Sequence, residues 1–199
     1  MVRSGVLCLV VPLLLFLTAN AQLVDPKLPP EAFIINFGNI TPAAVGLGGS
    51  VTVASMGNTP SLINSGVTFA RVRLNPGGAN APHTHPRAVE AFFVIRGKLQ
   101  VCFAEENGGV TVCNIIRRGE ATFFPQGTIH SQQNVGSRTA EFLAVLTSDN
   151  PGTLTISSRL FSLPDRVLSA ALNITDSQSD SIRNGIPANP VPAGPGSGY

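Results

Sequence analysis

The chain has 199 residues, with 13 Lys and Arg against 11 Asp and Glu, and 43% of its residues are hydrophobic. Its nearly balanced charge, without a dense basic run beyond Arg117-Arg118, argues against nucleic-acid binding, which needs a basic face to neutralise phosphates. The length suits one domain of ordinary size with a hydrophobic core of its own.

Residues 1–21 have the pattern of a secretory signal peptide. Arg3 precedes an apolar run from Val6 to Leu17, and the small residues Ala19-Asn20-Ala21 follow it. The run is too short for a membrane span, and no second run of this kind follows. We therefore expect a secreted, extracellular protein that begins at Gln22 and has no membrane span.

A Pro-rich, irregular segment is expected at 22–36, before a domain that we place at 37–175. Short stretches rich in Val, Ile, Phe and Thr, separated by Gly, Pro and Asn, continue to about Phe161. This spacing predicts an all-β sandwich or closed barrel. In the first clearly alternating stretch, "VTFARVRL", the side chains expected to face inward are Val67, Phe69, Val72 and Leu74. Five phenylalanines are also expected in the core: Phe92, Phe93, Phe103, Phe123 and Phe124.

The stretch "VCFAEENGGVTVC" predicts a β-hairpin, because Asn107-Gly108 at its middle is a strong tight-turn signal. Cys102 and Cys113 are equidistant from this turn, so the hairpin places them opposite each other, within disulfide range. In an oxidising compartment we expect a cross-strand disulfide, the alternative being two buried free thiols. Two Asn-x-Thr sequons, at Asn39 and Asn173, are candidate glycosylation sites on the secretory route.

The hydrophobic period changes after Pro164. In "DRVLSAALN" the apolar residues fall on one helical face, so a helix is expected here, packed on a neighbouring subunit. The rest of the chain, 176–199, ends in a Pro- and Gly-rich stretch and is expected to be disordered.

The three histidines are the most informative residues in the chain. His83 and His85 lie two residues apart, so on a strand both imidazoles point to the same face. Glu90 would face the other way on one straight strand, but Pro86 breaks the ladder and lets a new strand return the carboxylate to the same centre. His130 follows another strand and a Pro-x-Gly turn that would direct it inward.

Three neutral imidazole nitrogens and one carboxylate oxygen form a plausible site for a divalent transition metal. The alternative is a set of polar residues on an ordinary surface strand. We favour the metal site because it accounts for every histidine in the chain.

Two longer motifs carry a resemblance to a known family. "GGANAPHTHPRAVEAFFVIRG" reads G-x5-H-x-H-x4-E-x6-G, and "GEATFFPQGTIHSQQN" reads G-x5-P-x-G-x2-H-x3-N. These motifs resemble the two cupin boxes, and their residues are similar to those of germins and germin-like proteins. The chain lacks the N-terminal cysteine pair that germins usually have in the mature protein.

The resemblance implies a cupin β-jelly-roll barrel with C-terminal α-helices. It also implies one Mn2+ per subunit and homo-oligomers, dimers joined through the helices and often hexamers, in the apoplast or cell wall. The implied ligands are His83, His85, Glu90 and His130. Gly97, Pro125 and Gly127 correspond to turn residues of the family, and Asn134 to a structural polar residue.

Three functions follow as hypotheses. A dication with one carboxylate ligand leaves a local charge of about +1, which favours small anions such as superoxide or oxalate. Superoxide dismutation is the first hypothesis, with manganese alternating between Mn(II) and Mn(III). Oxalate oxidase is the second, but only Asn80 matches the two pocket asparagines of oxalate-oxidising germins, and the other corresponds to Ala70. The third is a non-enzymatic extracellular or storage protein with a structural metal.

Overall fold

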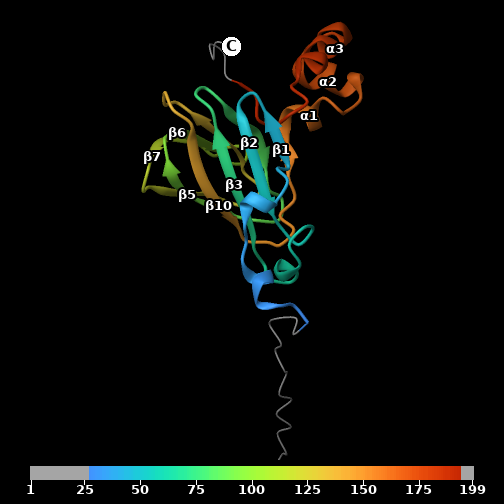
Figure 1. Cartoon of the computed structure of the whole chain (residues 1–199). Helices are drawn as coiled ribbons and strands as arrows, with labels where there is room; N and C mark the ends of the chain where they lie inside the picture. The colour runs from blue at the N-terminus through green and yellow to red at the C-terminus, as the bar shows by residue number, and fades with distance from the viewer. Residues whose placement is uncertain (1–26, 194–199) are drawn as a thin grey trace, which may run out of the picture.

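Two antiparallel sheets face each other in this computed structural model, which describes residues 27–193 (Figure 1). The expected signal peptide and the last six residues lie outside the described range. The six-stranded sheet contains, in spatial order, β1 (Ala44–Gly46), β2 (Gly49–Ala54), β3 (Thr68–Leu74), β10 (Ala140–Leu146), β5 (Glu90–Arg96) and β8 (Ala121–Phe124). The five-stranded sheet contains β11 (Leu154–Thr155), β4 (Ala79–Thr84), β9 (Ile129–Asn134), β6 (Lys98–Ala104) and β7 (Thr111–Arg117).

Short helices flank this barrel. Three single 3-10 turns precede or interrupt the first strands, at Pro30–Phe33, Phe37–Asn39 and Pro60–Leu62. Three α-helices follow the last strand: α1 (Ile156–Leu160), α2 (Asp165–Leu172) and α3 (Asp176–Gly185). The all-β jelly-roll with C-terminal helices is therefore confirmed. Across 27–193 no helix combines the length and apolarity that a membrane span requires.

The core lies between the sheets, where alternate side chains of each strand meet. On β3 the buried residues are Thr68, Ala70, Val72 and Leu74. The expected inward position of Val67 and Phe69 is wrong, because side chains alternate strictly and Leu74 fixes the even-numbered set on the inner face.

The same alternation corrects the prediction for two of the phenylalanines. Phe92 and Phe124 are buried, whereas Phe93 and Phe123 are 50% and 61% exposed. Neighbours along a strand point to opposite faces, so a Phe-Phe pair cannot place both rings in one core. Phe103 packs against the core and is partly buried.

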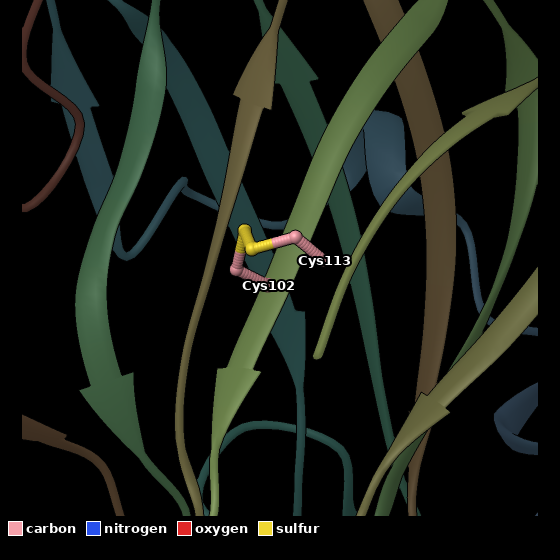
Figure 2. Close-up of a disulfide and its surroundings, with 2 residues drawn as sticks. All are labelled: Cys102 and Cys113. Atoms are coloured by element: carbon pink, nitrogen blue, oxygen red, sulfur yellow. A yellow bond between two sulfur atoms is a disulfide. The ribbon is translucent and has the colours of Figure 1, made fainter. Parts of the chain in front are cut away.

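The hairpin and its disulfide are confirmed. Cys102 on β6 pairs directly with Cys113 on β7, and a disulfide joins them (Figure 2). Gly108 in the turn between these strands has a φ of 93°, a left-handed conformation that glycine adopts without a steric penalty. This crosslink ties the edge strand β7 to the rest of the five-stranded sheet.

Two elements differ from the sequence-based prediction. The strand expected to reach Phe161 ends at Thr155, and α1 begins at Ile156. His130 follows β8 and the Pro125–Gly127 turn and is buried, as expected, and it is the second residue of a further strand, β9. The strand β9 lacks a hydrophobic alternation because its inward-facing residues are His130, Gln132 and Asn134.

The disorder expected from 176 onward is wrong for the described residues 176–193. Helix α3 begins with a capping box, in which the Thr175 hydroxyl accepts from Gln178 N–H and the Gln178 side chain accepts from Thr175 N–H. Arg183 forms an ion pair with Asp165 of α2, and Ser179 donates a hydrogen bond to the same carboxylate at 3.0 Å. These polar contacts between α2 and α3 stabilise a helix that has little hydrophobic signal of its own.

Beyond α3 the chain returns to the barrel as a strap, which we define as residues 189–192. Val191 is fully buried in the core. The strap accepts hydrogen bonds from Gly48 N–H, between β1 and β2, and from the backbone N–H groups of Ala79 and Ala81 on β4. It therefore links the two sheets along one side of the barrel.

We expect Val191→Ala to lower the free energy of unfolding by about 2 kcal/mol, because it removes two buried methyl groups from the core. The matched control is Val45→Ala on β1, where the side chain is 62% exposed and the expected change is within about 0.5 kcal/mol. Urea denaturation of both variants measures the difference. Equal effects would show that the strap does not contribute to the core in solution.

Candidate metal centre

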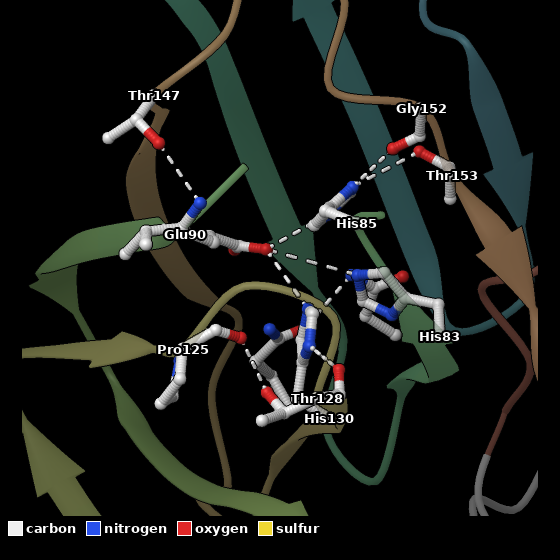
Figure 3. Close-up of polar contacts among 12 residues, drawn as sticks. His83, His85, Glu90, Pro125, Thr128, His130, Thr147, Gly152 and Thr153 are labelled. Atoms are coloured by element: carbon white, nitrogen blue, oxygen red, sulfur yellow. Dashed lines mark hydrogen bonds and ion pairs between the residues drawn. The ribbon is translucent and has the colours of Figure 1, made fainter. Parts of the chain in front are cut away.

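Four polar side chains from both sheets meet inside the barrel. His83 lies near the end of β4, and His130 lies directly opposite it on β9, in the five-stranded sheet. Glu90 is the first residue of β5, in the six-stranded sheet. His85 follows β4, in the turn that contains Pro86, so this turn brings ligands from the two sheets together (Figure 3).

The ligand atoms are already arranged around a common centre. One atom from each of the four residues lies within 4.8 Å of the others, and all four residues are buried. Glu90 Oε2 lies 3.1 Å from His85 Nε2, 3.2 Å from His130 Nε2 and 3.9 Å from His83 Nε2. Ligands about 2.1 Å from one metal ion and at right angles to each other are about 3 Å apart, so these spacings suit a shared ion.

Backbone carbonyls fix which nitrogen of each imidazole faces the centre. His83 Nδ1 donates to Ala81 O at 2.8 Å, and His130 Nδ1 donates to Thr128 O at 2.9 Å. His85 Nδ1 donates to Gly152 O at 2.6 Å. A carbonyl can only accept, so each Nδ1 carries a proton and each Nε2 faces the centre, where it offers a lone pair to a metal ion or, when protonated, donates to Glu90.

The burial of this cluster shifts the pKa of its groups in different directions. Desolvation is the largest influence on His83 and, together with the nearby imidazoles, lowers its pKa from 6.5 to about 4. For Glu90, desolvation raises the pKa, but hydrogen bonds from His130 and His85 outweigh it and lower the pKa to about 2. Desolvation also opposes charge on His85, yet the Glu90 carboxylate raises its pKa above 6.5.

This donor set fits a divalent cation. Glu90 is ionised, and three Nε2 lone pairs point toward the same centre. Such groups repel one another unless a positive charge lies among them, either a proton shared with an imidazole or a metal ion. Imidazole and carboxylate donors suit a first-row transition metal, and the donor types alone do not select one metal of that series.

Comparisons with known proteins identify the family. Residues 35–180 match the cupin family. The chain is a germin-like cupin. It is 34% identical to spherulin-1A of Physarum polycephalum, over 89% of this chain and 73% of that protein. It is 35% identical to germin-like protein subfamily 2 member 3 of Arabidopsis thaliana, over 82% of this chain and 77% of that protein. A solved structure of oxalate oxidase superposes with a TM-score of 0.73 and 29% identity, covering 80% of this chain and 83% of that one.

A cavity of about 240 Å³ lies beside the metal centre of this germin-like cupin. His83, His85 and Glu90 form part of its lining. Asn80, expected to contact substrate, also lines the cavity, but its Nδ2 already donates to Gln132 Oε1 at 2.9 Å. Ala70 lines it too, without any hydrogen-bonding group in its side chain.

Sequence reasoning missed two polar residues near this centre. Thr68 is fully buried and lines the cavity, and Gln132 is fully buried next to Asn80. Neither stands out in the sequence, because the pattern of inward positions is visible only once the strand register is known. The backbone carbonyls that orient His83 and His130 belong to Ala81 and Thr128. Each lies two residues before its histidine, so this short spacing was visible in the sequence.

The two sequons lie on the surface. Asn39 and Asn173 are both exposed, as a glycan requires. Asn173 ends α2 in a left-handed conformation, with a φ of 54°. Glycosylation at either position stays a prediction.

We expect the metal-free protein to lose stability as the pH falls from 6.5 to about 4. Folded His83 stays neutral until about pH 4, whereas the unfolded imidazole binds its proton near 6.5. The unfolded state therefore binds more protons in this window, and the free energy of unfolding falls by up to about 3 kcal/mol. The pKa of His85 is raised in the folded protein. Its contribution to the free energy of unfolding is therefore fully present below pH 6.5 and is lost only as the pH rises above that value.

Urea denaturation of the metal-free protein at several pH values between 4 and 6.5 measures this slope. Replacing His83 by Gln removes the titrating group while keeping a polar side chain, so the variant should have a flatter dependence. Parallel curves for the two proteins would contradict the assignment of the slope to His83.

Proposed function

We propose that this chain is a secreted, manganese-binding germin-like cupin that dismutates superoxide. The observation that supports this most directly is the buried His83-His85-Glu90-His130 cluster beside a cavity of about 240 Å³. A purely structural metal site is closed by its protein ligands, whereas a catalytic site leaves positions for a small molecule. Four protein ligands leave two such positions in an octahedral metal. The choice of manganese follows from the germin resemblance.

The protein residues supply charge balance and orientation. A bound manganese ion supplies one-electron oxidation and reduction, which converts two superoxide ions and two protons into oxygen and hydrogen peroxide. The ionised Glu90 would reduce the charge of a bound dication to about +1, because an imidazole binds a metal in its neutral form and adds no charge. The remaining positive charge attracts small anions into the barrel.

Oxalate oxidase is the second candidate, because a solved oxalate oxidase is structurally similar to this chain. Two features weaken it. Ala70 cannot donate the hydrogen bond that an asparagine would, and such a bond to a charged group contributes about 1.5–3 kcal/mol. Asn80 has one of its two amide hydrogens committed to Gln132.

Self-association is part of the proposal. Helices α2 and α3 project beyond one end of the barrel (Figure 1), and Val167, Leu172 and Ile182 on them are 45%, 42% and 43% exposed. Phe93 and Phe123 add an exposed apolar area on the outer face of the six-stranded sheet. Large exposed apolar side chains in clusters are typical of subunit contacts, which favours a homo-oligomer.

Elemental analysis of the secreted protein, with superoxide and oxalate assays on the same sample, tests the proposal. We expect close to one manganese per subunit and superoxide dismutation. Stoichiometric metal with neither activity would support the third hypothesis, a non-enzymatic wall or storage protein.

We expect His130→Ala and His83→Ala to remove bound metal and activity together, since each removes one of four ligands. Ser131→Ala is the matched control for His130→Ala, because Ser131 is the next residue on β9 and points to the other face. Circular dichroism checks that the variants are folded. Full metal content in either histidine variant would contradict the ligand assignment.

A separate variant tests the oxalate reading. Ala70→Asn places an amide on the cavity wall, so any oxalate oxidation should increase at least severalfold, by analogy with the free energy of one hydrogen bond to a charged group. The assay compares oxalate-dependent hydrogen peroxide release by the variant and the parent protein. An unchanged rate would remove the argument that this pocket position controls oxalate use.

A further inference from the structure

Positive charge is concentrated at the end of the barrel opposite the metal centre. Three turns cross between the two sheets here, at 96–98 between β5 and β6, at 117–120 between β7 and β8, and at 135–139 between β9 and β10. We call these three turns the corner face. Its exposed charged residues are five cations and one carboxylate: Arg96, Lys98, Arg117, Arg118, Arg138 and Glu120. The nearly balanced charge of the whole chain hides this face, because the cations come from turns that are distant in the sequence.

The three turns of the corner face are neighbours in space, and the β5–β6 turn lies between the other two. On one side, the backbone N–H and C=O of Val94, near the end of β5, both form hydrogen bonds of 3.0 Å with the β7–β8 turn. On the other side, Val135 N–H donates to Lys98 O at 3.0 Å. Lys98 also pairs directly with Arg117 across β6 and β7. The cations therefore form one continuous stripe and not a set of isolated charges.

Most of these cations have no partner in the protein. Within residues 27–193, side-chain hydrogen bonds and ion pairs are absent for four of them: Lys98, Arg117, Arg118 and Arg138. Arg96 uses its Nε alone, which donates to Glu141 Oε2 at 2.9 Å, so its two terminal amino groups are available. The Glu120 carboxylate accepts from a backbone N–H at 2.6 Å. Like charges held this close together repel one another, and a bound polyanion removes that repulsion.

A hollow of about 450 Å³ lies on the corner face, where Arg96 and Arg138 line it together with Gly97 and Thr139. A guanidinium is a flat fork of N–H donors that matches the two oxygens of a carboxylate or a phosphate. Two arginines that line one hollow therefore favour an anionic group inside it. The remaining cations of the stripe extend the positive charge beyond the hollow, which suits a polymer with repeated anionic groups better than a single small anion.

The compartment and the shape of the face narrow the class of polymer. The proposed secretion places the chain outside the cell, whereas nucleic acids and the anionic lipids of the cytoplasmic leaflet lie inside it. The corner face also consists of turns, and these present neither a helix nor a two-stranded ribbon of the kind that enters the major groove of DNA. Acidic polysaccharides are the polyanions that an extracellular protein meets.

We infer that the corner face binds a linear extracellular polysaccharide that carries carboxylates, such as a polyuronate. One carboxylate lies in the hollow between Arg96 and Arg138, and neighbouring carboxylates of the same polymer contact the other cations of the stripe. The inference goes beyond the proposed function and rests on it only for secretion, because polymer binding at this end needs no metal. It would hold the protein on the polymer while the metal centre, at the other end of the barrel, stays open to small molecules.

Titration calorimetry of the secreted protein with polygalacturonate, at several NaCl concentrations, tests this inference. Fully methyl-esterified polygalacturonate is the matched ligand, because it has the same backbone without the charges. We expect the acidic polymer to bind, with an affinity that falls steadily as the salt concentration rises, since binding releases the counterions of the polymer. The esterified polymer should not bind. Equal binding of the two polymers would overturn the inference.

A double variant locates the binding surface. Lys98→Gln with Arg118→Gln should bind polygalacturonate about fivefold more weakly and with a shallower salt dependence, because two exposed charge contacts are lost. The matched control is Arg159→Gln with Arg166→Gln, which removes the same charge from exposed side chains of α1 and α2. Its affinity should stay within about twofold of the parent protein. Equal losses in the two double variants would show that net charge, and not the corner face, controls binding.

Two other ligands test the class of polymer, single-stranded DNA and vesicles of anionic phospholipid, each at the same total charge as the polygalacturonate. Tighter binding of either one overturns the assignment to a polysaccharide. Manganese content and superoxide dismutation, measured on the same samples, report on the proposed function separately. Protein that contains manganese and is active but does not bind polygalacturonate overturns the corner-face inference alone. Protein that binds the polymer without metal or activity overturns the proposed function and leaves the corner face intact.

Discussion

The burial of the Glu90 carboxylate among three imidazoles is the constraint on which the rest of this structure depends. An ionised carboxylate inside a barrel requires positive charge nearby. The ion-pair partners of Glu90 within residues 27–193 are imidazoles, and the outer nitrogens of these imidazoles are already bonded to backbone carbonyls. The backbone therefore decides which nitrogen faces the centre. A small displacement of any of these carbonyls would turn a lone pair away from the centre, so the strands must be rigid for the site to exist.

The two sheets contribute differently to the site. The five-stranded sheet and the turn after β4 hold the histidines, while the six-stranded sheet supplies Glu90 and the apolar wall of the cavity. Residues on β2 and β3 can change the volume and polarity of the cavity without touching a ligand of the metal. Substitutions at these positions therefore change which small molecule fits the cavity while the metal-binding residues stay the same.

Local sequence signals predicted the parts of the structure that depend on short spacings. The two histidines at i and i+2 and the cysteines placed symmetrically about Asn107-Gly108 are of this kind. Predictions failed where contacts between distant segments determine whether a side chain is buried or exposed. Phe93 and Phe123 are hydrophobic yet face outward, Gln132 is polar yet fully buried, and Val191 packs into the core from a Pro-rich stretch that composition marks as disordered. In each case the strand register or a long-range contact outweighs the residue's own preference.

The strap also bears on how the protein reaches its folded state. Its hydrogen bonds to β4 satisfy the backbone N–H groups of Ala79 and Ala81, on a stretch of strand that β11 does not cover. The ribosome makes the strap after every other described element, with 144 positions separating Asn189 from its partner Val45. Until it docks, a growing chain has a bare strand edge next to the metal ligands, and bare edges pair readily with other chains. Docking of the strap therefore closes a strand edge that would otherwise be open to pairing with another chain.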